Sequence, residues 1–275
     1  MPLPPLKVRL ALLVGFTALA VAVALFAPAV PQPLDYHDFA DQRPMFGVVN
    51  FLDVASNAGF LLAGLWGLGV AVGPKTAFER PAERWPYAIF FVGLALTAAG
   101  SAYYHLVPDN ERLFWDRLPM TVAFMALVAA QIVDRISVRV GLALLAPALL
   151  VGAASVIHWI ATERAGQGNL VPYGVLQAYA VLVVLAIAVL HPSRYTHGNA
   201  IYWAFGAYVA AKVLETFDRE LFALGHVVSG HSLKHLAAAA SGFIVLAMLI
   251  RRRPRAAPAA SSEAARGARG PAATR

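Results

Sequence analysis

The stretch from Ser229 to Phe243, "SGHSLKHLAAAASGF", places two histidines four residues apart at the start of an apolar run. Side chains at positions i and i+4 of an α-helix share one face, with Cβ atoms about 6 Å apart. His231 and His235 can therefore hold one metal ion between them, or they can form a simple polar patch at a helix end. To choose between these two interpretations, we ask whether other helices place further metal-ligating side chains near the two histidines.

The composition indicates an integral membrane protein. Of the 275 residues, 59% are hydrophobic and only 13% are charged, whereas a soluble domain carries roughly 25% charged residues. The chain has no cysteine, which excludes disulfides, thiolate catalysis and cysteine-ligated metal sites.

Apolar runs predict the helices, because a bilayer-spanning helix needs about 20 mostly apolar residues. The sequence predicts an all-α, polytopic membrane helix bundle with a seven-helix core and one extra N-terminal helix. The predicted spans are Val8–Pro28, Phe51–Val72, Pro86–Val107, Leu118–Val133, Val140–Ile160, Val171–Leu190, Ala200–Thr216 and Leu233–Ile250.

Three regions follow from this pattern. Residues 1–30 are either a retained membrane helix or a cleaved signal peptide, and the length of the apolar run favours the helix. Residues 31–251 form the helical core domain. Residues 252–275 are rich in Ala, Pro and Arg and are predicted to be a disordered cytoplasmic tail. Much of the net charge of +7 lies in this tail, so we expect contact with anionic lipid, no nucleic acid and no protein partner.

Lysine and arginine in the short loops predict the orientation, because cytoplasmic loops are enriched in them. If the N-terminus is cytoplasmic, eight spans place more lysines and arginines in the cytoplasmic segments than in the outer ones. The C-terminus is then cytoplasmic as well. We therefore expect a multi-pass protein of a bacterial inner or plasma membrane.

Four ionisable residues then fall at the outer ends of their helices: His105, Asp116, His231 and His235. Ionisable groups at membrane depth are costly and are often functional. His105 is the available third imidazole for a zinc site with three protein ligands and an open position. Ser101 lies one turn deeper on the face of His105. Taken singly, each has an ordinary explanation: a hydrated interfacial histidine, a small packing residue, or a carboxylate at a helix N-terminus.

A second polar region is "LDYHDFADQRPMFGVVNFLDVASNAGF", residues 34–60. Its oxygen-bearing side chains suit calcium, although the spacing is not that of an EF-hand. The alternative is a solvated acidic linker followed by a helix N-cap. The residues concerned are Asp35, Asp38, Asp41, Asn50, Asp53, Ser56 and Asn57.

The chain resembles the alkaline ceramidase family, within the superfamily of seven-helix membrane hydrolases that also holds the adiponectin-type receptors. The shared pattern is Ser-x3-His, an Asp eleven residues later, and HxxxH in the last helix, here Ser101, His105, Asp116, His231 and His235. The resemblance covers Asp35 to Arg251 and leaves the first helix outside the core. It implies zinc on the three histidines, with Asp116 and Ser101 assisting the chemistry.

The N-terminal block departs from the family in part. The family pattern Glu-x2-Asn-Thr-x-Ser-Asn reads "NFLDVASN" here, so Ser56 and Asn57 match, while Asn50 replaces the Glu and Asp53 the Asn. Together with the earlier acidic residues, the resemblance implies a calcium site. Its ligands would be Asp35, Asp38, Asp41 and Asn50.

The implied activity is that of a ceramidase-like amidohydrolase acting on linear amides. It would use zinc. The expected partners are the bilayer and a lipid substrate. The substrate, ceramide or another N-acyl lipid, would be cleaved to a fatty acid and an amine such as a sphingoid base. Asp116 would be the general base and Ser101 would stabilise the oxyanion. The site would face the periplasm or exterior. Two alternatives stay open: a receptor-like or non-catalytic zinc protein of the same superfamily, and a transporter whose His and Asp residues relay protons.

Overall fold

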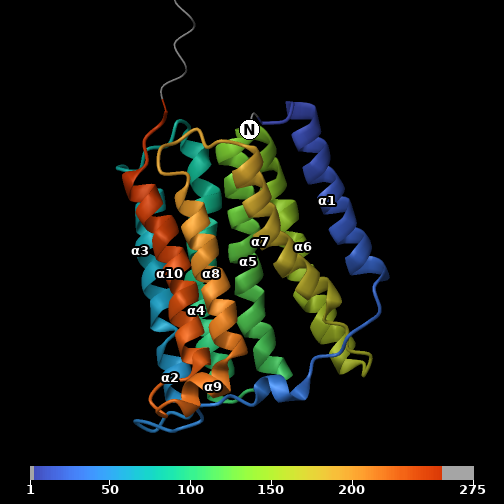
Figure 1. The fold of residues 1–275 in the computed structure, drawn as a ribbon, viewed down its shortest axis with the longest axis vertical. Coiled ribbons are helices and arrows are strands. Elements are labelled where there is room, and N and C mark those ends of the chain that lie inside the picture. Colours follow the sequence, from blue (N-terminus) through green and yellow to red (C-terminus); the bar gives the residue numbers. More distant parts are fainter. Residues whose placement is uncertain (1–2, 256–275) are drawn as a thin grey trace, which may run out of the picture.

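The computed structural model describes residues 3–255, and in this part of the chain all regular structure is helical. Eight long helical segments run side by side along the axis of the molecule (Figure 1). This confirms the predicted all-α bundle. The helices are α1 (Leu6–Phe26), α2 (Phe51–Ala55), α3 (Ala58–Val72), α4 (Arg84–Leu106), α5 (Asn110–Arg135), α6 (Val138–Arg164), α7 (Val171–Leu190), α8 (Ala200–Thr216), α9 (Asp218–Ala223) and α10 (Gly230–Arg251), with short 3-10 helices η1 (Leu34–His37) and η2 (Pro81–Glu83).

Seven segments within residues 3–255 are long and apolar enough to cross a membrane. They are α1, α2 with α3, η2 with α4, α5, α6, α7 and α10. The eighth segment, α8, has 17 residues and lies within the bundle against α10. The protein is therefore an integral, multi-pass membrane protein in its architecture.

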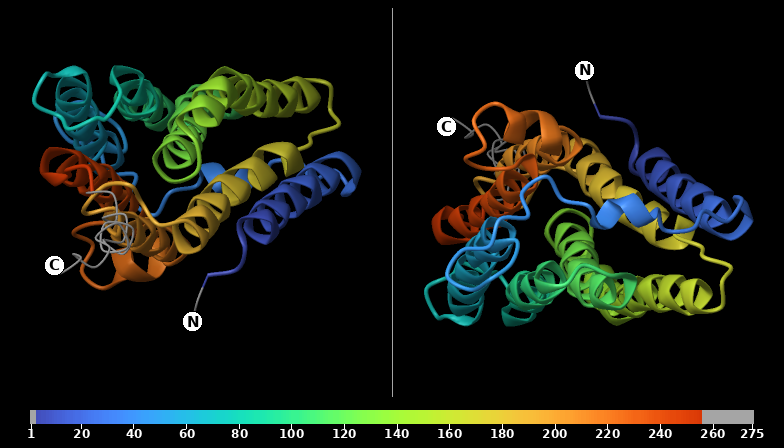
Figure 2. Two further views of the ribbon diagram at one scale, coloured as in Figure 1. Left: turned by 90° about the horizontal axis from the view of Figure 1, so that it is seen from above. Right: turned by 90° about the horizontal axis from the view of Figure 1, so that it is seen from below.

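Viewed along the bundle, the helices form two sides (Figure 2). Helices α3, α4, α5 and α6 follow one another on one side, each packed against the next, while α10, α8, α7 and α1 form the other. Contacts of α10 with α3 and of α5 with α7 join the sides. The N-terminal helix α1 has no buried residue and packs on α7, where Phe16 stacks on Tyr179 with ring centroids 5.6 Å apart.

The predicted span Phe51–Val72 is divided into α2 and α3 at Ser56 and Asn57, and polar residues extend other helices beyond the predicted apolar runs. Helices α7 and α8 have the predicted bounds. Helix α5 begins eight residues earlier than predicted, because the Asp109 side chain accepts a hydrogen bond from the Arg112 N–H at 2.7 Å and caps a polar first turn. Helix α10 begins at Gly230, where Ser229 caps the N–H of Ser232 at 3.0 Å.

Helices α4 and α5 meet in backbone contact. A Cβ added at Gly100 would lie 2.0 Å from the carbonyl oxygen of Trp115, and one at Gly93 would lie 2.7 Å from the N of Ala123. Only glycine allows the two backbones to approach so closely. This contact brings the end of α4 beside the start of α5.

Arg252 anchors the C-terminal end of α10. This residue is fully buried, and its guanidinium carbon lies 4.3 Å, 5.0 Å and 4.2 Å from the ring centroids of Phe78, Tyr87 and Tyr195. Residues 252–255 continue along the loop before α8, where the Thr196 N–H donates to the Arg253 carbonyl at 2.9 Å. The rest of the predicted tail, residues 256–275, lies outside the described residues.

Candidate metal centre

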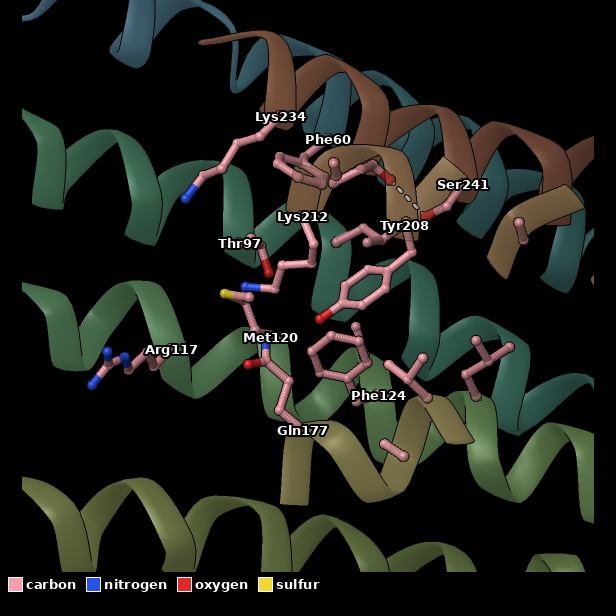
Figure 3. A pocket seen from close by; sticks show the side chains of 18 of the residues that line it. Phe60, Thr97, Arg117, Met120, Phe124, Gln177, Tyr208, Lys212, Lys234 and Ser241 are labelled. Atoms are coloured by element: carbon pink, nitrogen blue, oxygen red, sulfur yellow. Dashed lines mark hydrogen bonds between the residues drawn. The ribbon is translucent and has the colours of Figure 1, made fainter. Parts of the chain in front are cut away.

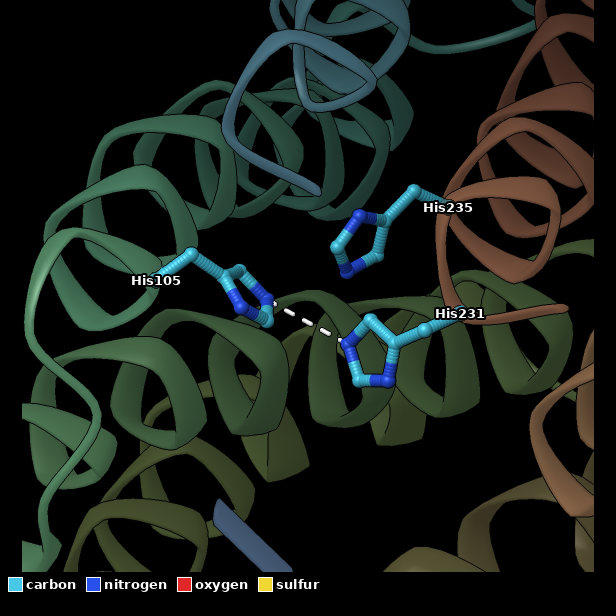
Figure 4. Close-up of side chains that lie close together, drawn as sticks. All are labelled: His105, His231 and His235. Atoms are coloured by element: carbon cyan, nitrogen blue, oxygen red, sulfur yellow. Dashed lines mark hydrogen bonds between the residues drawn. The ribbon is translucent and has the colours of Figure 1, made fainter. Parts of the chain in front are cut away.

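The three predicted histidines come together at one end of the bundle (Figure 4). His105 comes from the last turn of α4, and His231 and His235 come from the first two turns of α10. One ligand atom from each lies within 4.8 Å of the others. The three residues are buried, with 1%, 5% and 4% of their surface exposed. Within residues 3–255 this is the one group of three or more histidines and carboxylates with such geometry.

The rings form a nearly equilateral triangle. Their centroids are 4.8 Å apart for His105 and His231, 5.0 Å for His105 and His235, and 4.9 Å for His231 and His235. The Nε2 atoms of His105 and His231 face each other at 3.3 Å. Two nitrogens bound to one tetrahedral zinc at about 2.05 Å would be about 3.3 Å apart. Either metal coordination or a single hydrogen bond between the two rings explains this distance of 3.3 Å. The third histidine ring points to the same place, which a shared ion explains and a single hydrogen bond does not.

His235 has a partner that fixes the orientation of its ring. The Ser56 hydroxyl lies 2.8 Å from His235 Nδ1, and it also donates to the Asp53 carbonyl at 3.1 Å. A hydrogen bond at one ring nitrogen sets which nitrogen is left for a metal, here Nε2. In contrast, Nδ1 of His105 is buried with no hydrogen-bond partner among the described residues. The donor set of three neutral imidazoles suits zinc.

Asp53 supports the start of α10, next to the histidines. The residue is fully buried, and its Oδ1 accepts a hydrogen bond from the Ser232 hydroxyl at 2.6 Å. Ser232 lies between His231 and His235 in sequence. Asn57 donates to the Asp53 carbonyl at 2.8 Å. The block that the sequence marked as polar therefore lies directly behind the histidines.

A loop covers the outer side of the histidines. Phe39, which is buried, packs on His231 and His105 with ring centroids 4.4 Å and 4.6 Å apart. Asp218, the first residue of α9, accepts hydrogen bonds from the N–H of Ala40 at 3.0 Å and from the N–H of His231 at 2.7 Å. One carboxylate thus joins the loop to the helix that carries two of the histidines.

The predicted calcium ligands have other partners. The Asp41 carboxylate pairs with Arg43 at 2.8 Å, and this guanidinium holds the pKa of Asp41 below its usual value. Asp38 pairs with Arg219 at 2.6 Å. The Asn50 side chain donates to the carbonyl of His105 at 2.8 Å, while Asp35 is exposed in η1. These four side chains are not gathered into a common ligand set, and calcium binding stays a prediction.

The predicted catalytic pair lines a cavity beside the histidines. This cavity, here called the chamber, has a volume of about 340 Å³, within the range of small-molecule sites. Ser101, Asp116 and His235 all contribute to its wall. The close approach of α4 and α5 at Gly100 sets Ser101 beside Asp116. Ser101 and Asp116 thus share one cavity with His235, and their catalytic roles stay a prediction.

The deeper part of the chamber is apolar, and its outer part is charged. Apolar residues of α4, α5, α7 and α10 line the deep part, among them Phe90, Leu94, Leu127, Val184 and Val245. Figure 3 shows Lys212 and Lys234 reaching into the chamber from α8 and α10, with Arg117 on α5. A second hollow between α7 and α8 shares Gln177, Tyr208 and Lys212 with it, so the chamber extends toward the outer surface of the bundle.

Sequence reasoning did not single out Phe39, Arg117, Lys234 or Asp218. Lys234 had a visible signal, because it stands between the two histidines of an apolar helix. Arg117 directly follows Asp116 and is equally out of place in an apolar segment. Phe39 and Asp218 had no such signal, since their roles depend on where two loops meet.

The comparisons with known proteins add no identification. No known family model matches the sequence, and no curated protein matches it.

Proposed function

We propose that this protein is a zinc-dependent hydrolase that cleaves the amide bond of an N-acyl lipid within the membrane, with ceramide as the substrate indicated by the sequence resemblance. One observation carries the proposal. Three buried imidazoles converge, and one of them, His235, lines a largely apolar chamber together with Ser101 and Asp116. If the histidines were only a polar patch at the end of one helix, there would be no reason for a third histidine from another helix to join them.

The residues suit zinc as the ion. Three histidines leave one position open in a tetrahedral site, which is the arrangement of catalytic rather than structural zinc. A zinc ion held there would polarise the amide carbonyl and make a water molecule more acidic.

We assign proton transfer during hydrolysis to the carboxylate of Asp116, because it lines the same chamber as Ser101 and His235. It takes a proton from the attacking water as the new C–O bond forms, and it returns that proton to the amine nitrogen as the C–N bond breaks. The products are a fatty acid and a free amine. The Ser101 hydroxyl, on the adjoining turn of α4, donates a hydrogen bond to the carbonyl oxygen as negative charge develops on it.

The shape of the chamber supports a lipid substrate. Its apolar depth accommodates an acyl chain, while the amide lies at the polar end beside the histidines. Because the loop with Phe39 covers the histidines from outside, we infer that the lipid enters sideways. The hollow between α7 and α8, which adjoins the chamber, provides this route.

We further propose that the metal centre faces the periplasm or exterior. The centre lies at the end of the bundle opposite the C-terminus of α10 (Figure 1), and the arginines that follow α10 belong on the cytoplasmic side by the distribution of positive charge. Reporter fusions after Arg253 and in the loop at Asp109 should report opposite compartments. Two fusions in one compartment would refute the orientation.

Zinc content and fatty-acid release, measured on the same purified protein, test the function. We expect about one zinc per chain and release of fatty acid from N-acyl lipids. His231→Ala should lose both, whereas His158→Ala, an exposed histidine of α6, should lose neither. Zinc without turnover on any amide lipid would favour a receptor-like protein, and absence of stoichiometric zinc would favour a proton-relay transporter.

A further inference from the structure

The outer part of the chamber holds more positive than negative side chains. Three cationic residues line it, namely Arg117, Lys212 and Lys234, together with two carboxylates, Asp116 and Glu215. Ionisable groups at membrane depth are expensive unless they are paired. A bound metal ion would add further positive charge to the same space. This imbalance requires an explanation that hydrolysis of a neutral amide does not provide.

Arg117 has no acidic partner of its own. Only 4% of the residue is exposed, and its Nη2 donates to the Gln32 side-chain oxygen at 2.7 Å. Its Nη1 is buried with no hydrogen-bond partner among the described residues. Aromatic rings surround the guanidinium carbon at 4.3 Å, 4.8 Å and 5.4 Å, contributed by Trp159, Tyr173 and Tyr36. A buried guanidinium is ordinarily matched to a carboxylate or phosphate, whose geometry it fits.

The two lysines share a single carboxylate. Lys212 Nζ lies 2.7 Å from one oxygen of Glu215, and Lys234 Nζ lies 2.5 Å from the other. One carboxylate balances one of the two ammonium groups. With Asp116 counted as well, the lining holds two carboxylates against three cations, so one positive charge has no counter-charge. Lys234 directly precedes His235 on α10, so this group of cations adjoins the histidines.

We propose that the amine half of the substrate carries an anionic group, a carboxylate or a phosphate, which Arg117 and the paired lysines bind. The inference rests on the proposed amide hydrolysis and narrows its substrate class. The acyl chain fills the apolar depth, which leaves the amine half at the outer end where the cations lie. Ceramide, whose head group is neutral, is then a poorer substrate than its charged counterparts.

Matched substrate pairs test this directly with the wild-type, zinc-loaded protein in detergent. N-palmitoylglycine and N-palmitoylethanolamine share the acyl chain and the amide and differ in a carboxylate. Ceramide 1-phosphate and ceramide differ in a phosphate. We expect kcat/KM to be at least about ten-fold higher for the anionic member of one pair, since sites built to pair a group discriminate strongly against its absence. The pair that shows the preference identifies the anion. Equal kcat/KM within both pairs would overturn the proposal.

Binding to the metal-free protein separates recognition from catalysis. With zinc removed, the anionic lipids should raise the melting temperature in detergent more than their neutral partners do. If no lipid is hydrolysed but this preference is present, the amide hydrolysis fails while the anion site stands. If palmitate alone stabilises as much as N-palmitoylglycine, the cations hold the fatty-acid product, and the proposal is wrong.

Variants locate the site. Arg117→Gln should lower the preference at least about ten-fold, mainly through KM for the anionic lipid, and Arg117→Lys should restore part of it. Lys212→Gln, at a partly exposed position, gives a second test if the buried Arg117 variant does not fold. Arg164→Gln removes an exposed cation that pairs with Glu111 at the same end of the bundle, and it should leave the preference unchanged. Retention of the full preference in both Arg117→Gln and Lys212→Gln would refute this placement.

Discussion

The phenyl ring of Phe39 lies 4.4 Å from the imidazole ring of His231, measured between centroids. A residue of the loop between α1 and α2 therefore covers a cluster of three histidines that come from α4 and α10. Access to an ion from the aqueous phase depends on this ring.

Phe39→Ala should accelerate metal loss. Without the phenyl ring, water and chelator reach the histidines from outside, so zinc should transfer to an excess of chelator at least about ten times faster than from the wild type. Metal content before the challenge should be unchanged, because all three ligands remain. Phe26→Ala, at an exposed position in the N-terminal helical region, is the control. A wild-type rate in Phe39→Ala would show that the ring does not seal the centre.

Asp116→Asn should separate metal binding from proton transfer. Asparagine is nearly isosteric with aspartate but cannot accept a proton, so we expect full zinc content and a loss of about 10²-fold or more in kcat, the usual contribution of a positioned base. Metal analysis and fatty-acid release measure the two effects. Loss of zinc would make Asp116 a ligand, and retention of both zinc and activity would exclude it as the base.

Ser56→Ala should weaken the metal site without unfolding the protein. The Ser56 hydroxyl orients the His235 ring through Nδ1, and loss of such a partner typically lowers metal affinity by about 10- to 100-fold. Competition with a zinc chelator measures the affinity. Ser155→Ala is matched to it, because the Ser155 hydroxyl bonds only the Gly152 carbonyl of its own helix at 2.7 Å. Equal affinities in the two variants would exclude the orienting role.

Acid should release the loop at Asp41. The pKa of this carboxyl is lower in the folded protein than in the unfolded chain because Arg43 pairs with it. Its contribution to stability is therefore present above the unfolded pKa of about 3.9 and is lost as the pH falls through the folded value below it. Hydrogen exchange of residues 40–50, corrected for intrinsic rates, should be unchanged between about pH 5 and 8 and should rise at lower pH.

Two variants check the source of that pH dependence. Asp41→Asn should show at pH 6 the faster exchange that the wild type shows only in acid. Asp38→Asn removes the exposed pair with Arg219 and should change little, since exposed pairs contribute little to stability. Identical exchange in Asp41→Asn and the wild type at pH 6 would contradict the assignment.

The bundle was predictable because each spanning helix must be apolar along its own length, and such a run is visible in a single stretch of sequence. The end of α4, the start of α5 and the start of α10 were predicted on one side from the alternation of spans alone, and the structure brings Ser101, His105, Asp116, His231 and His235 to that end. Their spacing along the chain also fixed which residues of each helix share a face.

The surroundings of the site were less accessible to prediction. The position of Phe39 depends on the hydrogen bonds of Asp218 to Ala40 and His231, which join residues far apart in sequence. The environment of Arg117 is built from η1, α6 and α7. Asp41 was expected to offer its oxygens to calcium, and nothing in the local sequence indicated that Arg43, two residues on, would pair with them.

The burial of Arg252 has a consequence for how substrate preference can evolve. With Arg252 held among three aromatic rings at one end and His231 held through Asp218 at the other, α10 is anchored at both ends. The distance from its histidines to His105 is then insensitive to what occupies the chamber. The opposing wall belongs to α5, α7 and α8, so substitutions there can reshape the acyl slot for longer or shorter chains while the metal centre keeps its geometry. Under the proposed function, acyl-chain length preference can then change without a change in the three histidines.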